Sequence, residues 1–344
     1  MASLPPPAPG DGPAPSDGRS PDPPVEVLWQ RPAGGAPRAV FLLAHGCRHA
    51  GTDFWPAGPG CEGCLGLPEE VRILRAALAR GFVAMAVTSV DRMSGCWVQE
   101  DFARVEAAVA HVYEAEGLPT ALPLYAFGAS SGGALVGGLA RSVVLGPSRL
   151  RCRIPQIMRV PGHADFSAIG ADGAEVTWRA PPTLFVHMPR DARTAVRIWE
   201  EGLPPLRAAG VPAAELRCEP QRVSDGFFAG RIAGVTPAQS AAMAAALRGG
   251  GLLDEDGLLA ADPRKGAEWR EALLATGVPQ ELGDSLEADA SAICEEMNVA
   301  WASHEMCSTF AEEMLDFCED PAGACARHGM DCGGGRAADA AATR

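Results

Sequence analysis

The 344-residue sequence has no long apolar run, no excess of basic residues and no apolar segment near its start. No stretch approaches the roughly 18 apolar residues that a membrane-spanning helix needs, so we expect no transmembrane segment. The net charge of −14 argues against a nucleic-acid partner, because binding to phosphate backbones requires clustered Lys and Arg. Residues 1–25 lack the apolar core of a signal peptide, and three Asp residues interrupt what would be an acid-poor transit peptide. We therefore expect a soluble, cytoplasmic protein, with an organellar location left open.

The chain contains 11 cysteines, but at this length it can build its own apolar core and needs no disulfide framework. Cys61 and Cys64 form a CxxC motif without a second CxxC at the spacing of a zinc site. A reduced pair and a disulfide or redox pair both remain open for this motif. We expect no metal site and no cofactor.

Both ends of the chain are rich in small and polar residues. Residues 1–25 consist mainly of Pro, Gly, Ala, Ser and Asp, and residues 329–344 have a similar character. Such a composition cannot bury enough apolar surface to offset the entropy lost on ordering the chain. Both segments are predicted to be disordered.

Between the two ends, short apolar runs alternate with amphipathic stretches. This alternation is typical of an α/β fold, in which a mostly parallel, doubly wound sheet is covered by helices on both faces. The predicted core comprises residues 26–220. Its strands are predicted at Ala39–Ala44, Phe82–Val87, Leu122–Phe127, Thr183–His187 and Ala214–Cys218, and its helices at Glu69–Arg80 and Phe102–Glu116.

The alternation stops after residue 220. Residues 221–283 contain helical patterns and no βαβ unit, which predicts an inserted helical subdomain before the C-terminal helices. Residues 284–328 are predicted to complete the core with two amphipathic helices, Ser285–Ala300 and Met306–Cys318.

The most specific motif is Gly128-Ala129-Ser130-Ser131-Gly132, which joins an apolar strand to a helix that starts with small residues. This GxSxG spacing is typical of a nucleophile elbow, because the two glycines leave room for the sharp turn that exposes the serine. Ser130 is therefore the predicted nucleophile. The backbone N–H of Ser131, at the positive end of the following helix, is a predicted donor to an oxyanion.

A second loop of interest follows the first predicted strand, at His45-Gly46-Cys47. In the hydrolase fold the corresponding loop donates a backbone N–H to the oxyanion, so Gly46 and Cys47 are the candidate donors. We expect His45 to orient this loop. We also place His45, Phe54 and Trp55 in the candidate substrate pocket, although ordinary core packing explains the two aromatic residues equally well.

A serine nucleophile also needs an acid and a base. Asp191 follows the predicted strand Thr183–His187, where the acid is expected in the chain order Ser, Asp, His; a solvated surface Asp is the alternative. No histidine directly follows the predicted strand Ala214–Cys218, so the usual position of the base is empty. Of the seven histidines, His163 and His304 remain, and His304 is favoured because it directly precedes the last amphipathic helix. A structural histidine at a helix start is the alternative.

Several stretches resemble a plant and green-algal family of α/β-hydrolase-like proteins. They are FLLAHGCRHAGTDFWP, CEGCLGLPEE, FGASSGG, PPTLFVHMPRD and EEMNVAWASHEM, and they span about residues 38–320. The resemblance implies a hydrolase fold with a helical insertion and includes the segment around His304, but it implies no substrate. The HGC segment and the serine elbow also resemble polyester depolymerases and feruloyl-esterase-type hydrolases over these short motifs. The missing histidine after the last strand departs from the usual hydrolase pattern.

These residues together predict a serine hydrolase of the carboxylesterase type that acts on a small-molecule acyl substrate. Ser130 would attack the acyl carbonyl, His304 would accept and return the proton, and Asp191 would orient His304. The alternative is a non-catalytic protein of the same fold that binds a ligand or a partner. The sequence indicates no particular protein partner.

Overall fold

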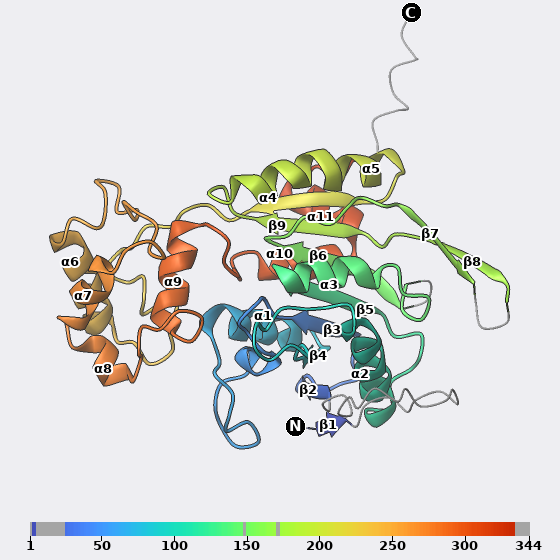
Figure 1. The fold of residues 1–344 in the computed structure, drawn as a ribbon, viewed down its shortest axis with the longest axis horizontal. Coiled ribbons are helices and arrows are strands. Elements are labelled where there is room, and N and C mark those ends of the chain that lie inside the picture. Colours follow the sequence, from blue (N-terminus) through green and yellow to red (C-terminus); the bar gives the residue numbers. More distant parts are fainter. Residues whose placement is uncertain (1, 5–24, 147–148, 170–172, 334–344) are drawn as a thin grey trace, which may run out of the picture.

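The computed structural model describes residues 2–4, 25–146, 149–169 and 173–333 (Figure 1). Most of the two segments predicted to be disordered, residues 5–24 and 334–344, lies outside these ranges. Residues 2–4 differ from the prediction, because they form a short strand that pairs with the central sheet.

The described strands form a central eight-stranded sheet in the order β1-β2-β4-β3-β5-β6-β9-β10 (Figure 1). The pairs β1/β2 and β2/β4 are antiparallel, whereas the pairs from β4 to β10 are parallel. This topology, with the serine elbow directly after β5, is the α/β-hydrolase fold and confirms the predicted fold class. The strands are β1 (Ala2–Leu4), β2 (Val25–Gln30), β3 (Ala39–Ala44), β4 (Phe82–Val87), β5 (Leu124–Ala129), β6 (Leu150–Gln156), β9 (Thr183–His187) and β10 (Ala213–Arg217).

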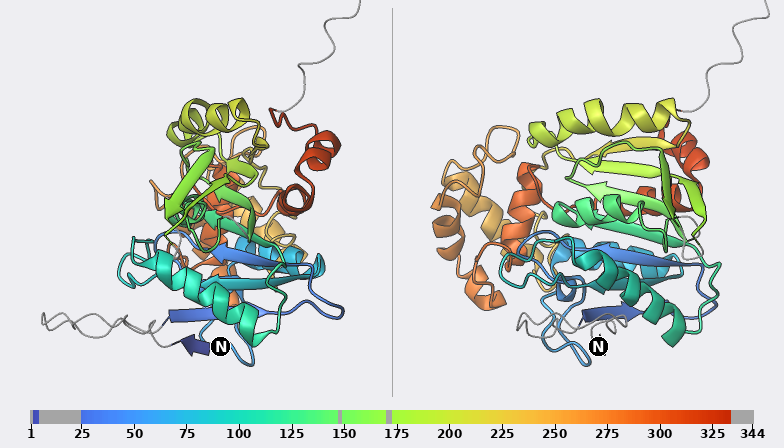
Figure 2. Two further views of the ribbon diagram at one scale, coloured as in Figure 1. Left: turned by 90° about the vertical axis from the view of Figure 1, so that its right-hand side faces the viewer. Right: turned by 45° about the vertical axis from the view of Figure 1, so that its right-hand side comes forward.

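Helices cover both faces of the sheet (Figure 2). Strand side chains alternate between two apolar clusters, so that Phe41 and Leu43 face one layer of helices while Val40 and Leu42 face the other. This double burial explains why the strands read as continuous apolar runs. One layer contains α1 (Pro68–Ala79), α10 (Ala311–Glu319) and α11 (Pro321–His328). The other contains α2 (Asp101–Ala115), α3 (Ser131–Leu139) and the consecutive helices α4 (Ala192–Arg197), η2 (Ile198–Gly202) and α5 (Leu203–Ala208).

A two-stranded antiparallel pair, β7 (Asp165–Ile169) and β8 (Glu175–Arg179), extends away from the central sheet (Figure 1). The sequence patterns did not identify these strands or β6. β6 has the sequence LRCRIPQ, in which two arginines interrupt the apolar pattern, although every residue except Arg151 is buried.

Residues 221–283 join neither sheet and instead form a helical group at one end of the molecule (Figure 1). The group contains α6 (Pro237–Gly249), α7 (Glu268–Leu274) and α8 (Val278–Leu282). Its apolar cluster includes Met243, Leu247 and Trp269 and continues into Ile293 and Met297 of α9 (Ala292–Trp301). The insertion therefore packs against the helix that leads to His304.

The two C-terminal helices begin later than the sequence predicts. Leu286 and Asp289 have φ values of 55° and 62°, which an α-helix does not allow, and α9 starts only after Ser291 caps it by accepting the Cys294 N–H. The next predicted helix starts at Ala311 rather than Met306, because the backbone N–H and carbonyl of Cys307 both bond to the side chain of Gln156 instead. Both corrections concern the segment around the candidate base.

The described residues include three disulfides, Cys47–Cys96, Cys61–Cys64 and Cys325–Cys332. The structure thus contains a disulfide in the CxxC motif, which is one of the alternatives that the sequence left open. In the part of the chain that the structure describes, no helix is both long and apolar enough to cross a membrane.

We predict that Leu247→Ala lowers the free energy of unfolding by about 2–5 kcal/mol, because truncating a fully buried side chain leaves a cavity in the core of the insertion. Leu274→Ala is the matched control, since Leu274 lies in the same subdomain and is 43% exposed; its effect should stay within about 0.5 kcal/mol. Urea denaturation measures both changes. Equal effects of the two substitutions would contradict this packing.

Candidate active site

Ser130 occupies the sharp turn between β5 and α3. Its backbone has φ 51° and ψ −117°, a strained conformation for a residue with a side chain. The flanking glycines are required by close approach: a Cβ on Gly128 would lie 2.2 Å from the Gly132 carbonyl oxygen, and a Cβ on Gly132 would lie 2.3 Å from the Ala44 carbonyl oxygen. The glycine spacing is therefore a packing requirement of this turn.

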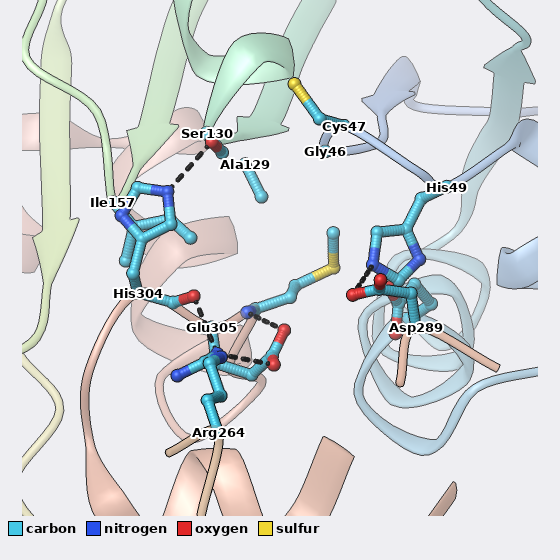
Figure 3. A pocket seen from close by; sticks show the side chains of 12 residues that line it. Gly46, Cys47, His49, Ala129, Ser130, Ile157, Arg264, Asp289, His304 and Glu305 are labelled. Atoms are coloured by element: carbon cyan, nitrogen blue, oxygen red, sulfur yellow. Dashed lines mark hydrogen bonds and ion pairs between the residues drawn. The ribbon is translucent and has the colours of Figure 1, made fainter. Parts of the chain in front are cut away.

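Two hydrogen bonds join Ser130 to His304 and Asp191. Ser130 Oγ lies 2.9 Å from His304 Nε2 (Figure 3), and His304 Nδ1 lies 2.7 Å from Asp191 Oδ2. An ionised carboxylate only accepts hydrogen bonds, so Nδ1 carries the proton and Nε2 is left to accept the serine hydroxyl. The structure thus brings together three residues that the sequence singled out, across separations of 174 and 113 positions.

Asp191 is fixed at the N-terminus of α4. Its Oδ1 accepts the Thr194 N–H at 3.3 Å, while Oδ2 faces His304. Burial acts to raise the pKa of Asp191, but the hydrogen bonds from His304 and Thr194 outweigh it and leave the pKa below its usual value. The carboxylate therefore stays ionised at neutral pH and can hold the histidine in the tautomer described above.

A residue of the insertion holds the segment that carries His304. The Arg264 guanidinium donates to the His304 carbonyl at 3.0 Å and to Glu305 Oε2 at 2.9 Å (Figure 3). It also donates to the Ser303 carbonyl at 2.6 Å. These bonds span about 40 positions of sequence, so spacing alone gave no signal for Arg264.

The loop that carries Asp191 also binds the segment that leads to His304. Arg190 donates its backbone N–H to the Ala302 carbonyl at 3.2 Å and its guanidinium to the Trp301 carbonyl at 3.0 Å. The guanidinium also lies 3.5 Å from the centre of the Trp301 ring. The acid loop and the base segment are therefore tied by both backbone and side-chain contacts.

Gln156, at the end of β6, connects the elbow to the chain that follows His304. Its carbonyl accepts the Ser130 N–H at 2.9 Å. Its buried side chain donates to the Cys307 carbonyl at 2.8 Å and accepts the Cys307 N–H at 2.9 Å. Sequence reasoning missed this residue because it missed the strand on which it lies.

The loop His45-Gly46-Cys47 lies beside the elbow, where a Cβ on Gly46 would be 3.8 Å from Ser130 Cβ. Among the described residues, the N–H groups of Cys47 and Ser131 have no hydrogen-bond acceptor. Both are therefore free to bind an oxyanion, and Cys47 is further anchored by its disulfide to Cys96.

His45 holds this loop from inside the protein. Nε2 accepts the Ser89 N–H at 3.1 Å, so the proton is on Nδ1, which donates to the Gly46 carbonyl at 2.7 Å. Burial lowers the pKa of His45 to about 4, and the ring stays neutral. This position agrees with an orienting role.

A cavity of about 340 Å³ opens between Ser130 and His304 on one side and His49 and Asp289 on the other (Figure 3). Its described lining residues are Gly46, Cys47, His49, Glu70, Ala129, Ser130, Ile157, Arg264, Asp289, His304, Glu305 and Met306. The candidate pocket residues His45, Phe54 and Trp55 are not among them: the first two are completely buried, and Trp55 Nε1 donates to Gln30. The structure does not bring these three side chains to the cavity.

The ionisable side chains opposite Ser130 were not predicted. His49 Nδ1 lies 2.9 Å from Asp53 Oδ2. Burial acts to lower the pKa of His49, but the hydrogen bond to Asp53 and the charge of Glu70 raise it to about 9, so the ring is protonated at neutral pH. Burial also raises the pKa of Glu70, which faces the buried Glu295.

Protonation of His49 should stabilise the fold in a defined pH range. Because its pKa rises from 6.5 to about 9 on folding, this contribution is complete below pH 6.5 and disappears as the pH rises through about 9. The difference in unfolding free energy between the parent and His49→Gln should therefore shrink by on the order of 3 kcal/mol between about pH 6 and pH 10. Urea denaturation across this range tests it, with the exposed His163→Gln as control; a difference that stays constant with pH would refute the assignment.

The sequence matches no family model and no curated protein. Among solved structures, esterase PE8 is 14% identical with a TM-score of 0.40, over 57% of this chain and 90% of that chain. LpqC, a poly(3-hydroxybutyrate) depolymerase from Bordetella parapertussis, is 17% identical with a TM-score of 0.39, over 75% and 91% of the two chains. Est1E from Butyrivibrio proteoclasticus with bound ferulic acid is 11% identical with a TM-score of 0.35, over 57% and 86%. At these scores we infer no activity from the similarities, and the fold assignment rests on the sheet topology.

Proposed function

We propose that this protein is a serine hydrolase that cleaves small esters in the manner of a carboxylesterase. The observation that carries the proposal is the continuous chain of hydrogen bonds from Ser130 through His304 to Asp191. This chain supplies a hydroxyl, a base in the required tautomer and an ionised acid in contact with one another.

In the proposed mechanism His304 Nε2 removes the proton from Ser130 Oγ as this oxygen bonds to the acyl carbon. Asp191 stabilises the imidazolium that forms. The free N–H groups of Cys47 and Ser131 bind the oxyanion, and the N-terminus of α3 favours its negative charge. His304 then returns the proton to the leaving alcohol. In the second half, His304 activates a water molecule that hydrolyses the acyl-enzyme and releases Ser130.

The volume and the ionisable lining of the cavity favour small, polar substrates. Its volume of about 340 Å³ lies near the lower end of the roughly 300–1,000 Å³ common for small-molecule sites. Glu70, Asp289 and Glu305 line it together with the basic side chains of His49 and Arg264. A long alkyl chain would desolvate these groups without offering them partners, so short acyl groups are preferred.

A fluorophosphonate probe tests the nucleophile, because labelling requires an activated hydroxyl. The parent protein should be labelled, and Ser130→Ala should abolish labelling. Ser131→Ala is the matched control and should be labelled like the parent, because the proposed role of Ser131 uses its backbone N–H and its side-chain oxygen makes no hydrogen bond to the described residues. If the folded parent fails to react, the alternative of a non-catalytic binding protein is favoured.

The base is tested by hydrolysis of a short-chain ester. Members of a triad act as a unit, so His304→Ala should reduce kcat by about the same several orders of magnitude as Ser130→Ala. The exposed His163→Ala should keep most of the parent's activity. An active His304→Ala beside an inactive Ser130→Ala would mean that another group serves as the base.

Arg264 is proposed as a positioning residue that acts through His304. Arg264→Gln should lower kcat about 10- to 100-fold with a smaller change in KM, because small displacements of a catalytic group are costly. It should also shift the pH profile of kcat, and Arg264→Lys should restore part of the activity. Arg222→Gln removes an exposed arginine from the same insertion and should have no effect. Loss of activity only in step with loss of folding would refute the positioning role.

A further inference from the structure

A second cavity, of about 200 Å³, lies beside the later turns of α3. Ala134, Gly137 and Gly138 of this helix line one part of it, and another part is lined by Arg159, Val160, Pro161 and His163, which follow β6. Ser130 does not line it, and no step of the proposed hydrolysis uses it.

The charged residues that line this cavity are three arginines, and His163 lines it as well. The three are Arg141, Arg153 and Arg159, and no Asp or Glu stands among the described lining residues. Arg159 forms an ion pair with Glu201 outside the cavity, so its charge is already balanced. Arg141 is exposed, and its side chain makes no hydrogen bond or ion pair with the described residues.

Arg153 is the unusual member of this group because it is only 1% exposed. Its Nε donates to Thr183 Oγ1 at 2.8 Å and its Nη1 to the Gly137 carbonyl at 2.9 Å. Among the described residues, its Nη2 has no hydrogen-bond partner and no carboxylate forms an ion pair with the guanidinium. A buried charge without a counter-ion is expensive, so an anion bound beside Arg153 would stabilise this arrangement.

We propose that the cavity binds phosphate, either as the free ion or as the phosphoryl group of a small phosphomonoester. The Nη2 of Arg153 donates to one phosphate oxygen, and Arg141 closes over the ligand from the rim. Two guanidinium groups that form no ion pair with the described residues match the charge of a dianion better than that of a single carboxylate. The cavity is smaller than a typical drug-sized site, which also favours a small ligand.

Isothermal titration of the full chain with inorganic phosphate, at an ionic strength held constant with chloride, tests the proposal. Saturable binding is expected in the parent. Arg141→Gln should weaken it about tenfold or more, as expected for losing a charge-assisted hydrogen bond. Arg248→Gln, which removes an exposed arginine of the insertion, is the control and should bind phosphate like the parent. Ser130→Ala should also bind like the parent, so this result is independent of whether the protein is a hydrolase.

Arg153→Met is a second variant that keeps much of the side-chain volume and removes the charge. If it folds, it should lose phosphate binding; if it does not, the exposed Arg141 still decides the test. Glycerol phosphate distinguishes the two forms of the ligand, because only a site open to a phosphomonoester will bind it. The proposal is overturned if phosphate gives no saturable binding, if Arg141→Gln binds like the parent, or if acetate binds as tightly as phosphate.

Discussion

The candidate site depends on holding a serine and a histidine that are 174 positions apart in sequence at hydrogen-bond distance. Gln156 meets this constraint from one strand end, because its carbonyl binds the Ser130 N–H while its amide pairs with both backbone groups of Cys307. Gln156 and Cys307 are buried, and leaving one of the groups that they pair unsatisfied would cost about 1–3 kcal/mol. The nucleophile and the segment after the base are therefore located by the sheet itself rather than by flexible loops.

The path of the chain explains why no histidine directly follows β10. After β10 the chain leaves the sheet, forms the insertion and returns through α9, so that His304 arrives about 90 residues later than the end of the strand. A base at the end of so long an excursion needs support. The insertion supplies it through an apolar cluster shared with α9 and through the bonds of Arg264 to the His304 segment.

The features that could be predicted from the sequence are those that leave a pattern in a short stretch of residues. Ser130 could be found because the glycines at positions 128 and 132 are required by sterics of the turn, and the apolar strands could be found because both faces of the sheet are covered. Gln156 and Arg264 could not be found, because their partners are distant in sequence and their own neighbours carry no pattern. Phe54 illustrates the remaining limit: an apolar residue in a loop is compatible with a pocket or a core, and only tertiary packing places it in the core.

The buried charged groups near the two cavities differ in whether they can lose their charge, and the difference follows from acid–base chemistry. Beside the serine, Glu70 and Glu295 face each other in the interior, and burial raises the pKa of both, so the pair can lower its charge by keeping a proton. Arg153 has no such option: burial lowers its pKa only to about 10, so it remains charged at neutral pH. A buried carboxyl group can neutralise itself, whereas a buried guanidinium must be neutralised by something else. In the part of the chain that the structure describes no carboxylate does so, and the proposed phosphate would supply that charge.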